Sequence, residues 1–347
     1  MAVKRRVLLL CGGQSEEHEV SLSSARSVLA AVGDRLELTL QVIDRQGELL
    51  PAAEAKALLG VTHTLAAPST GATRLPSLVN RQAEAVDVVF PLLHGPYGED
   101  GSVQGLLKLM NVPQVGSGIA GSAVGMDKLL MKAVFAARGL PQLPYCAVTR
   151  RRWQTAPQAV IAELADLAYP RFVKPANLGS SIGISKVENP VALPDALEEA
   201  ARYDRRIVVE EGVVARELEV AVLGNDEAEA SPVGEICHHN NFYDYHTKYS
   251  QGQARLQIPA DIPAHIQAQA QDLALQAFAA IDAAGLARVD FFYREASEHL
   301  PEALFINEIN TMPGFTATSM YPKLWQAAGL SYADLIMRLV ELALEPR

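Results

Sequence analysis

The segment 287–314 carries the residue types in this chain that are best suited to chemistry. Two apolar runs with the composition of β-strands flank a charged turn, and each run includes carboxylate or amide side chains. If the runs pair as antiparallel strands about that turn, Asp290 lies opposite Glu308 and Arg288 lies opposite Asn310. Side chains alternate between the two faces of a strand, so we expect all four on one face of a ribbon.

These four side chains suggest a cation site with an anion beside it. The carboxylates of Asp290 and Glu308 and the amide of Asn310 supply oxygen ligands that suit a hard cation, above all Mg²⁺. Arg288 adds a positive charge that can hold an anion, which outlines a site for phosphoryl transfer or carboxylate activation. The alternative is a solvated face with a cross-strand Arg–Asp pair, and a β-bulge would change the register.

A second candidate site lies where a strand that ends at Lys174 enters a loop of small residues. Gly179 and Gly183 let the backbone of this loop approach a ligand closely. Backbone N–H groups there can hold phosphate oxygens, and Lys174 adds a point charge. We therefore predict phosphate binding, and the alternative is an ordinary hairpin with an exposed lysine.

Two further segments have the composition of ligand-binding elements. Glu210, Glu211 and Glu217 flank a turn between apolar strands and can accept hydrogen bonds from an adenine amine or a ribose hydroxyl, although such residues are more often solvated. Residues 238–252 are aromatic and polar without periodicity, which indicates a long loop of the kind that forms a lid.

Composition excludes several classes of protein. The 347 residues carry a net charge of −10, which argues against a partner that is a nucleic acid. The three cysteines, Cys11, Cys146 and Cys237, are far apart, so we expect neither a disulfide scaffold nor a zinc knuckle and predict a cytoplasmic protein. No apolar stretch is long enough to span a membrane. Residues 116–121 match G-x-G-x-x-G, but no acidic residue follows at the spacing of a dinucleotide site.

The order of the predicted elements indicates an α/β protein of three parts, with boundaries at 1–117, 118–210 and 211–347. The first part is a small open α/β sheet, whose ligands would sit at the carboxyl ends of its strands. Predicted strands are 6–11, 38–43, 86–93, 171–174, 183–187, 207–210 and 218–223, and predicted helices follow residue 18, span 128–138 and 193–202, and lie on either side of the 287–314 ribbon.

Seven blocks of sequence together resemble the D-alanine–D-alanine ligases, a family of the ATP-grasp superfamily. They cover nearly the whole chain in family order and read GGQSEEHEVSLSSA at 12–25, HGPYGEDG at 94–101, MDK at 126–128, VKPANLGSSIGISKV at 173–187, YDYHTKY at 243–249, RVDFF at 288–292 and NEINTMPGFTATS at 307–319. The resemblance implies a three-domain ATP-grasp architecture, in which an N-terminal open α/β sheet domain precedes two α+β domains that clamp ATP.

The resemblance also implies roles for individual residues. For ATP, it implies phosphate contacts by Lys128, Lys174, Gly179, Ser180, Ser181 and Lys248, and contacts to the adenosine by Glu210 and Glu217, with a less certain one by Glu211. It implies that Mg²⁺ is bound by Asp290, Glu308 and Asn310. For catalysis, it implies that the tetrahedral intermediate is stabilised by Arg288 and the backbone N–H of Gly314, and that a lid latch is formed by Ser180, Glu17 and Tyr249. For the substrates, it implies that Glu17 receives the ammonium of the first D-alanine, that His94 lies nearby, and that Ser319 contacts the carboxylate of the second.

The implied reaction uses ATP to phosphorylate the first D-alanine, and the amine of the second then attacks the acyl phosphate to give D-alanyl-D-alanine for the bacterial cell wall. The family further implies two Mg²⁺ ions, for which Mn²⁺ can substitute, and a homodimer. Two alternatives stay open. One is a related ligase that uses D-serine or D-lactate, against which the pair Lys248 and Tyr249 argues. The other is a non-catalytic ATP-binding protein, against which the intact Arg288 and metal ligands argue.

We expect Tyr249→Phe to loosen the lid, because the variant loses the phenol that would bond to Ser180. Water would then reach the acyl phosphate, and more ATP would be consumed per dipeptide formed. The ratio of phosphate released to dipeptide made, compared with the unaltered chain, measures this effect, and an unchanged ratio contradicts the latch. Hydrogen exchange over residues 238–252 tests the lid, which we expect to become protected when ATP and a phosphinate analogue of D-alanine bind.

Overall fold

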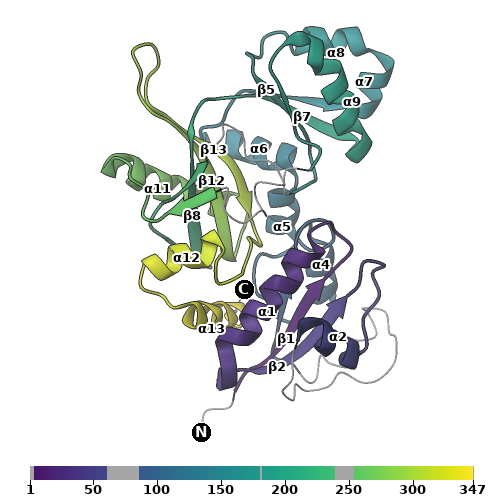
Figure 1. Ribbon diagram of the computed structural model, residues 1–347, viewed down its shortest axis with the longest axis vertical. Helices are drawn as coiled ribbons and strands as arrows, with labels where there is room; N and C mark the ends of the chain where they lie inside the picture. The colour runs from purple at the N-terminus through teal and green to yellow at the C-terminus, as the bar shows by residue number, and fades with distance from the viewer. Residues whose placement is uncertain (1–3, 61–85, 180–181, 239–253, 347) are drawn as a thin grey trace.

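Three β-sheets, each with helices packed on it, follow one another along the long axis of the molecule (Figure 1). The structure, a computed structural model, describes residues 4–60, 86–179, 182–238 and 254–346. Its mixture of helices and sheets confirms the predicted α/β class. None of the described helices combines the length and the apolar character that a membrane crossing requires.

The first sheet has three parallel strands in the order β2-β1-β3, which span Glu37–Ile43, Arg6–Gly12 and Val88–Leu92. Strands β1 and β3 are nearly continuous apolar runs, as is typical of parallel strands that are buried on both faces, whereas β2 begins with alternating polar and apolar residues. Helix α1 packs on β1, and the apolar residues whose spacing predicted this helix are buried. The helices of this part are α1 (His18–Val32), α2 (Ala52–Leu59) and α4 (Ser102–Leu109). The chain leaves the carboxyl ends of β1 and β3 toward Glu17 and His94, which places both at one edge of the sheet.

The second sheet has four antiparallel strands in the order β4-β7-β5-β6, which span Tyr145–Thr149, Arg206–Glu211, Arg171–Pro175 and Ser185–Val187. It is accompanied by α7 (Arg150–Thr155), α8 (Pro157–Glu163) and α9 (Leu193–Tyr203), which share its apolar core. In this register Lys174 pairs with Val208, two residues from Glu210 on the neighbouring strand. The two charged side chains are therefore diagonal neighbours on one face.

The third sheet follows the path β11-β10-β8-β12-β13, and β9 pairs with β8 beside it. Helices α6 and α11 pack into the same apolar core as β8 and β12, so α6 joins the middle of the chain to this sheet. The bounds are Arg216–Gly224 for β8, Glu229–Ala230 for β9, Gly234–His238 for β10, Ala254–Gln257 for β11, Gly285–Arg294 for β12, Ala303–Asn310 for β13, Lys128–Ala137 for α6 and Ala264–Ala280 for α11.

The register of the ribbon β12–β13 confirms the pairing that the sequence predicted. Arg288 is paired with Asn310, and Asp290 with Glu308. The register shifts directly after Asp290, so that the distal part of the ribbon pairs one residue out of the predicted alignment. Because this bulge begins beyond the charged pairs, it leaves the four chemistry-bearing side chains in their predicted positions.

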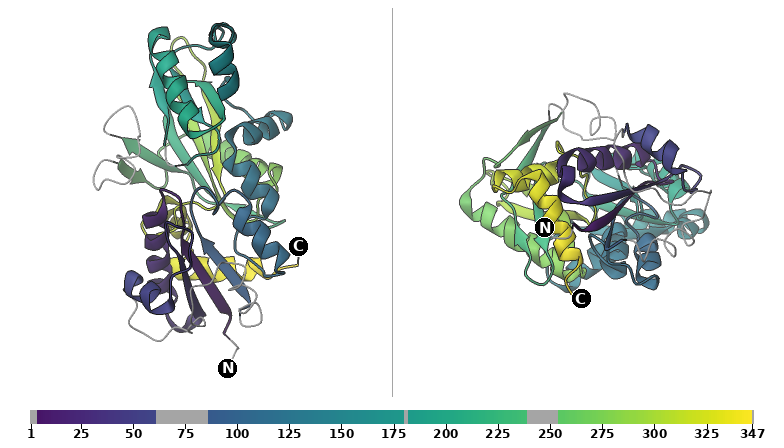
Figure 2. Two further views of the ribbon diagram at one scale, coloured as in Figure 1. Left: turned by 90° about the vertical axis from the view of Figure 1, so that its right-hand side faces the viewer. Right: turned by 90° about the horizontal axis from the view of Figure 1, so that it is seen from below.

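The C-terminal helices return to the first sheet. Helix α12 (Met320–Ala327) lies on β8, and α13 (Tyr332–Ala343) lies beside α1, as both views show (Figures 1 and 2). Phe315, which is fully buried, precedes both helices and lies at the centre of an aromatic cluster. Its ring centroid is 5.4 Å from that of Phe90 on β3, 6.0 Å from Tyr321 on α12 and 5.6 Å from Tyr332 on α13. This cluster fixes the start of the C-terminal helices against the first sheet.

The G-x-G-x-x-G segment makes a close backbone contact rather than a dinucleotide turn. A Cβ atom at Gly285, where β12 begins, would lie 3.0 Å from the backbone nitrogen of Gly116. Gly116 and Gly285 both have positive φ angles, of 98° and 74°. The glycines therefore let the connection into α5 (Ile119–Met126) lie directly against the third sheet.

The strands and helices predicted in the described parts of the chain are present with bounds that differ by a few residues, and the closing helix is two helices, α12 and α13. The sequence patterns did not predict α2, α4, α5, α7, α8, β4, β9, β10 or β11. The division at residues 117 and 210 stays a prediction, because α6 from the middle part shares its core with the third sheet and α13 from the last part packs on α1.

We expect Phe315→Ala to lower the free energy of unfolding by about 3–5 kcal/mol, because it leaves a cavity among three aromatic rings. Urea denaturation followed by circular dichroism measures the change. Leu109→Ala is the matched control, since the Leu109 side chain is 87% exposed and its truncation should cost less than about 0.5 kcal/mol. Equal effects of the two substitutions would show that the aromatic cluster does not hold the C-terminal helices in place.

Candidate active site

A buried arginine and a carboxylate form the centre of the candidate site on the ribbon β12–β13. The guanidinium of Arg288 donates two hydrogen bonds to the carboxylate of Asp290, with N–O distances of 2.6 and 2.7 Å. The amide of Asn310 donates to the same carboxylate at 3.1 Å, and Glu308 is the cross-strand partner of Asp290. The four predicted side chains therefore converge, and Asp290 lies in the middle of them.

Glu219 completes this cluster, although sequence reasoning missed it. It lies on β8 opposite Asp290, and its carboxylate is 3.1 Å from Nε of Arg288. Burial by itself would lower the pKa of Arg288, but the charges of Asp290 and Glu219 raise it well above its ordinary value. The guanidinium is therefore held as a cation. The signal in the sequence was the alternation of acidic and apolar residues in Glu217-Leu218-Glu219-Val220, which puts the two glutamates on one face of β8.

Lys128 links the ribbon to the glycine-containing loop. It is the first residue of α6, and the preceding Asp127 caps that helix and forms an ion pair with Arg206. The ammonium of Lys128 donates to the carbonyl of Leu178 at 2.8 Å and lies 3.6 Å from the carboxylate of Glu308. A phosphate that is bound near this ammonium would thus lie between the third sheet and the loop at Gly179.

Lys174 and Glu210 form a buried ion triad with Lys132, which sequence reasoning also missed. One oxygen of Glu210 accepts from Lys174 at 2.7 Å, and the other accepts from Lys132. Burial by itself would raise the pKa of the Glu210 carboxyl, but the two ammonium groups lower it. Burial lowers the pKa of Lys132, whereas Glu210 and Glu308 outweigh burial at Lys174 and raise its pKa. The clue to Lys132 was its place one helical turn after Lys128, on a helix that is otherwise apolar.

This triad changes the interpretation of the acidic residues. The side chain of Glu210 is only 2% exposed and both of its oxygens bind lysines, so a contact with adenosine would require an ion pair to open. Glu211 points elsewhere and accepts from the backbone N–H of Ala168 at 2.8 Å. Glu217 lies on β8 close enough for its charge to raise the pKa of Lys174. The predicted adenosine contacts of all three glutamates stay predictions.

Glu17 lies between the loop 94–101 and the backbone at Gly179. A Cβ atom at Gly95 would be 2.9 Å from a carboxylate oxygen of Glu17, and one at Gly179 would be 3.1 Å from the same oxygen. Gly95 also has a positive φ angle of 74°, which favours glycine, whereas a side chain at Gly179 would require the end of the Glu17 side chain to shift slightly. The arrangement brings the predicted ammonium receptor next to the predicted phosphate loop.

His94 is buried behind Glu17 and connects the first sheet to the C-terminal part of the site. Its Nδ1 lies 3.0 Å from the carbonyl oxygen of Met312, and its Nε2 lies 3.3 Å from the hydroxyl of Ser24. A carbonyl oxygen only accepts, so Nδ1 carries the proton in its bond to Met312. Both ring nitrogens thus contact groups of the protein, which suits a positioning role.

Gly314 and Ser319 lie together in the loop after β13. A Cβ atom at Gly314 would be 3.4 Å from the hydroxyl oxygen of Ser319, which also accepts from the backbone N–H of Thr316 at 3.1 Å. Ser319 occupies the N-cap position of α12. The positive end of a helix favours an anion, which agrees with the predicted contact to a substrate carboxylate.

Four predicted site residues fall outside the described part of the chain: Ser180, Ser181, Lys248 and Tyr249. Gly179 is the last described residue before the first two of them. The lid and its latch therefore stay predictions.

The donor set on the ribbon fits Mg²⁺. Within the described residues, no three or more His, Cys, Asp or Glu side chains are grouped to hold a metal ion. Asp290 and Glu308 provide two carboxylates and Asn310 an amide oxygen, which is the pattern of a site that Mg²⁺ shares with substrate phosphates. The lysines on the facing elements supply positive charge for those phosphates.

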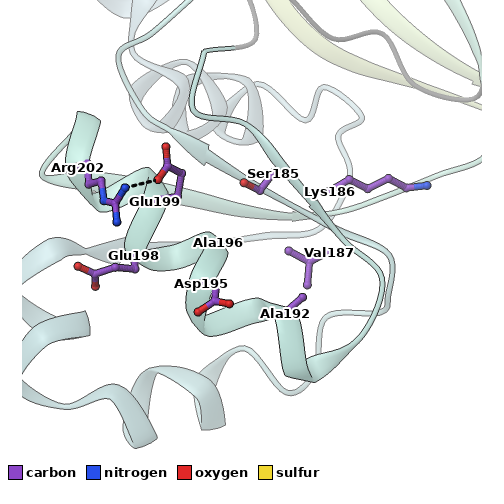
Figure 3. Close-up of a pocket in the computed structure, with 9 residues that line it drawn as sticks. All are labelled: Ser185, Lys186, Val187, Ala192, Asp195, Ala196, Glu198, Glu199 and Arg202. Atoms are coloured by element: carbon purple, nitrogen blue, oxygen red, sulfur yellow. Dashed lines mark ion pairs between the residues drawn. The ribbon is translucent and has the colours of Figure 1, made fainter.

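A separate groove of about 460 Å³ lies between β6 and α9 (Figure 3). Its charged lining includes Lys186, Asp195 and the ion pair between Glu199 and Arg202, whose N–O distance is 3.0 Å. None of the predicted site residues lines this groove. It is therefore not the candidate active site.

Solved structures with the same arrangement identify the class of the fold. The chain resembles a D-alanine–D-alanine ligase from Coxiella burnetii with a TM-score of 0.79 and 33% identity, over 99% of this chain and 94% of the other. It resembles VanG, a D-Ala:D-Ser ligase from Enterococcus faecalis, with a TM-score of 0.81 and 31% identity, over 98% of this chain and all of the other. Both have the ATP-grasp fold, and so does this chain.

Sequence comparison identifies the family. Residues 6–117 match the family described as D-ala D-ala ligase N-terminus, and residues 134–341 match its C-terminus counterpart. A D-alanine–D-alanine ligase of Deinococcus radiodurans is 54% identical over 99% of this chain and all of the relative. One from Heliobacterium modesticaldum is 48% identical over 99% of this chain and 95% of the relative. The chain belongs to the D-alanine–D-alanine ligase family.

We expect Glu210→Gln to lower the free energy of unfolding by about 3–5 kcal/mol, because two buried lysines lose their shared counter-charge. The carboxylate contributes to stability at neutral pH and loses this contribution as the pH falls through its lowered pKa. The difference between the unaltered chain and the variant should therefore shrink in acid.

Denaturant titrations at several pH values measure this difference. Glu163→Gln is the control, since it breaks an ion pair with Arg152 in which both side chains are about half exposed, and it should change the stability little. A constant difference between the unaltered chain and Glu210→Gln from acid to neutral pH would contradict the assignment of the triad.

Proposed function

We propose that the chain joins two molecules of D-alanine to D-alanyl-D-alanine and converts ATP to ADP and phosphate. The observation that carries the proposal is that Lys128 and Lys174 lie close to the ribbon carboxylate of Glu308. The chain that holds them is 54% identical, over 99% of its length, to a D-alanine–D-alanine ligase. The product is a dipeptide of the bacterial cell wall.

The reaction requires activation of a carboxylate, which is a poor electrophile. A carboxylate oxygen of the first D-alanine attacks the γ-phosphorus of ATP, ADP leaves, and an acyl phosphate forms. The amine of the second D-alanine then attacks the carbonyl carbon, loses a proton, and phosphate leaves as the peptide bond forms. Charge develops on the phosphoryl oxygens in the first step and on the carbonyl oxygen in the second, and positioned cations and N–H donors lower both barriers.

The phosphate end of ATP would lie among Lys128, Lys174 and the loop at Gly179. The two ammonium groups neutralise the phosphoryl oxygens, and Glu210 with Lys132 holds Lys174 in place. Backbone N–H groups of the loop add hydrogen bonds, and we assign Ser180, Ser181 and Lys248 to the same end of the nucleotide. Glu210 and Glu217 are assigned to the adenosine side, and Glu210 reaches it when one of its lysine pairs opens.

Asp290, Glu308 and Asn310 would hold Mg²⁺, as two ions or with Mn²⁺ in its place. The cation would supply positive charge that neutralises the phosphate oxygens of ATP. For Asp290 to serve as a ligand, part of its bonding to Arg288 must open. Glu219 then keeps a carboxylate next to the guanidinium, so that Arg288 stays fixed near the reacting groups.

The two amino acids would lie between the first and third sheets. Glu17 receives the ammonium of the first D-alanine, with His94 behind it, and the helix N-terminus at Ser319 receives the carboxylate of the second. Arg288 and the N–H of Gly314 stabilise the oxyanion of the tetrahedral intermediate. The latch of Ser180, Glu17 and Tyr249 excludes water from the acyl phosphate. We assign the protein to the cytoplasm and to a homodimer, as the family implies.

The identity of the second substrate is the point that an assay decides. The similarity to VanG, which is named as a D-Ala:D-Ser ligase, keeps D-serine as the second candidate. Phosphate release should be measured with ATP, Mg²⁺ and D-alanine, and with D-serine or D-lactate added at limiting D-alanine, with the products resolved by mass spectrometry. We expect D-alanyl-D-alanine as the main product. A preference for D-alanyl-D-serine or for the D-lactate ester would overturn the assignment, and no phosphate release with any acceptor would favour a non-catalytic nucleotide-binding protein.

We expect Arg288→Met to reduce kcat by about 10²–10³-fold, because it removes a donor to the oxyanion of the transition state. The Kd for ATP should change far less, since the negative charge that Arg288 binds develops only during the reaction. Steady-state kinetics together with calorimetry separates the two effects. Equal losses in kcat and ATP affinity would assign Arg288 to ground-state binding.

We expect Glu308→Gln to reduce kcat strongly at limiting Mg²⁺ while the circular dichroism spectrum and thermal midpoint stay close to those of the unaltered chain. The substitution keeps the shape of the side chain and removes one charge from the cation site. If both Glu308→Gln and Asp290→Asn keep full turnover at limiting Mg²⁺, the metal ligands have been assigned wrongly.

A further inference from the structure

Glu99, in the loop 94–101, has contacts that set it apart from the other acidic residue of that loop. Both oxygens of its partly buried carboxylate accept hydrogen bonds from backbone N–H groups. One accepts from Gly95 at 2.6 Å, within the same loop, and the other accepts from Met312 at 3.2 Å, which lies 213 residues further along the chain. Asp100, in contrast, accepts from the N–H groups of Tyr97 and Ser102, both of which are close to it in the sequence.

The loop holds both polar groups of Met312. Glu99 accepts from its N–H, and Nδ1 of His94 donates to its carbonyl oxygen at 3.0 Å. Met312 lies two residues after Asn310 and two residues before Gly314. Its backbone is therefore attached to the first sheet at a point between a predicted metal ligand and the predicted donor to the oxyanion.

Several charges face Glu99. Burial and the neighbouring carboxylate of Glu17 raise the pKa of Glu99 to about 8, while the N–H groups of Gly95 and Met312 and the charge of Arg288 oppose the rise. His94 faces the same loop through its bond to Met312. Above this pKa the carboxylate is ionised and accepts both N–H groups more strongly, because charge-assisted hydrogen bonds are roughly twice as strong as neutral ones.

We propose that Glu99 is a positioning residue that acts through the backbone of Met312 to fix the Gly314 N–H relative to Glu17. The proposal rests on the proposed function, in which Glu17 binds the first substrate and Gly314 stabilises the intermediate. The two substrates would bind to parts of the chain that are far apart in sequence, and Glu99 joins those parts at one peptide group. A displacement of this donor by about 1 Å would cost about 10²-fold in rate.

The proposal predicts a separation of kinetic effects. Glu99→Ala removes the acceptor and should lower kcat by about 10–10²-fold, while the KM for ATP stays within about threefold. Glu99→Gln keeps one acceptor oxygen but turns an NH₂ group toward a backbone donor. Its turnover should therefore fall below that of the wild type by a smaller factor at low pH, where Glu99 is protonated, than at high pH, where Glu99 is ionised. The ratio of wild-type to Glu99→Gln turnover should therefore rise between about pH 6 and pH 9.

Asp100→Asn is the matched control, because it removes the same charge from the same loop, keeps an acceptor oxygen, and leaves the tie to Met312 intact. Its turnover ratio to the wild type should not vary across that pH range. A Glu99→Gln ratio that is flat with pH, or one that Asp100→Asn reproduces, would overturn the proposal. So would a Glu99→Ala variant that folds and keeps kcat within about twofold.

Hydrogen exchange of the ligand-free protein gives a readout that does not depend on activity. The amide of Met312 should exchange faster in Glu99→Ala than in the wild type, and the same peptide in Asp100→Asn should be unchanged. Equal exchange in all three proteins would refute the tie. If the wild type makes no dipeptide, the proposed function fails, while the exchange result still decides whether Glu99 holds Met312. If Glu99→Ala does not fold, the same exchange measurement on Glu99→Gln decides it.

Discussion

The pairing of the buried Arg288 is the interaction on which the rest of the site depends. A guanidinium out of contact with water needs carboxylate partners, and Asp290 and Glu219 provide them from its own strand and from the neighbouring strand β8. The strand order β8-β12-β13 brings these groups together, because it puts Glu219, Asp290 and Glu308 in one row across the sheet. Asp290 thereby belongs both to the ion pair and to the proposed cation site.

A second group of buried, paired charges lies between the second and third sheets. Lys174, Glu210 and Lys132 form a buried group with an excess of one positive charge, and Glu308 lies close enough to raise the pKa of Lys174. The triphosphate of ATP would add the missing negative charge. The ligand-free protein thus holds its cations in the places where a nucleotide would need them, which limits the reorganisation that binding requires.

Much of this arrangement was predictable from the sequence, because its determinants are local. The spacing of apolar residues fixed α1, and the near-symmetry of the ribbon about its turn gave the pairs Asp290–Glu308 and Arg288–Asn310. The partners Lys132, Glu219 and Glu99 escaped prediction because each acts on a residue at least 69 positions away, and only the packing of different elements brings them together. Glu210 illustrates the same limit. Its place beside a turn between apolar strands suggested a ligand contact, and the neighbouring sequence did not show that two lysines pair with it.

The central claim is that the face of β12–β13 holds the cation that ATP brings, and a crystal structure with ADP, Mn²⁺ and a phosphinate analogue of D-alanine tests it most directly. Data collected near the manganese absorption edge locate the ions without reference to the surrounding atoms. We predict an anomalous peak within about 2.0–2.5 Å of oxygen atoms from Asp290, Glu308 and Asn310, with Arg288 still bound to Glu219. A peak that lies away from these three side chains, with Asp290 still bonded through both oxygens to Arg288, would contradict the account.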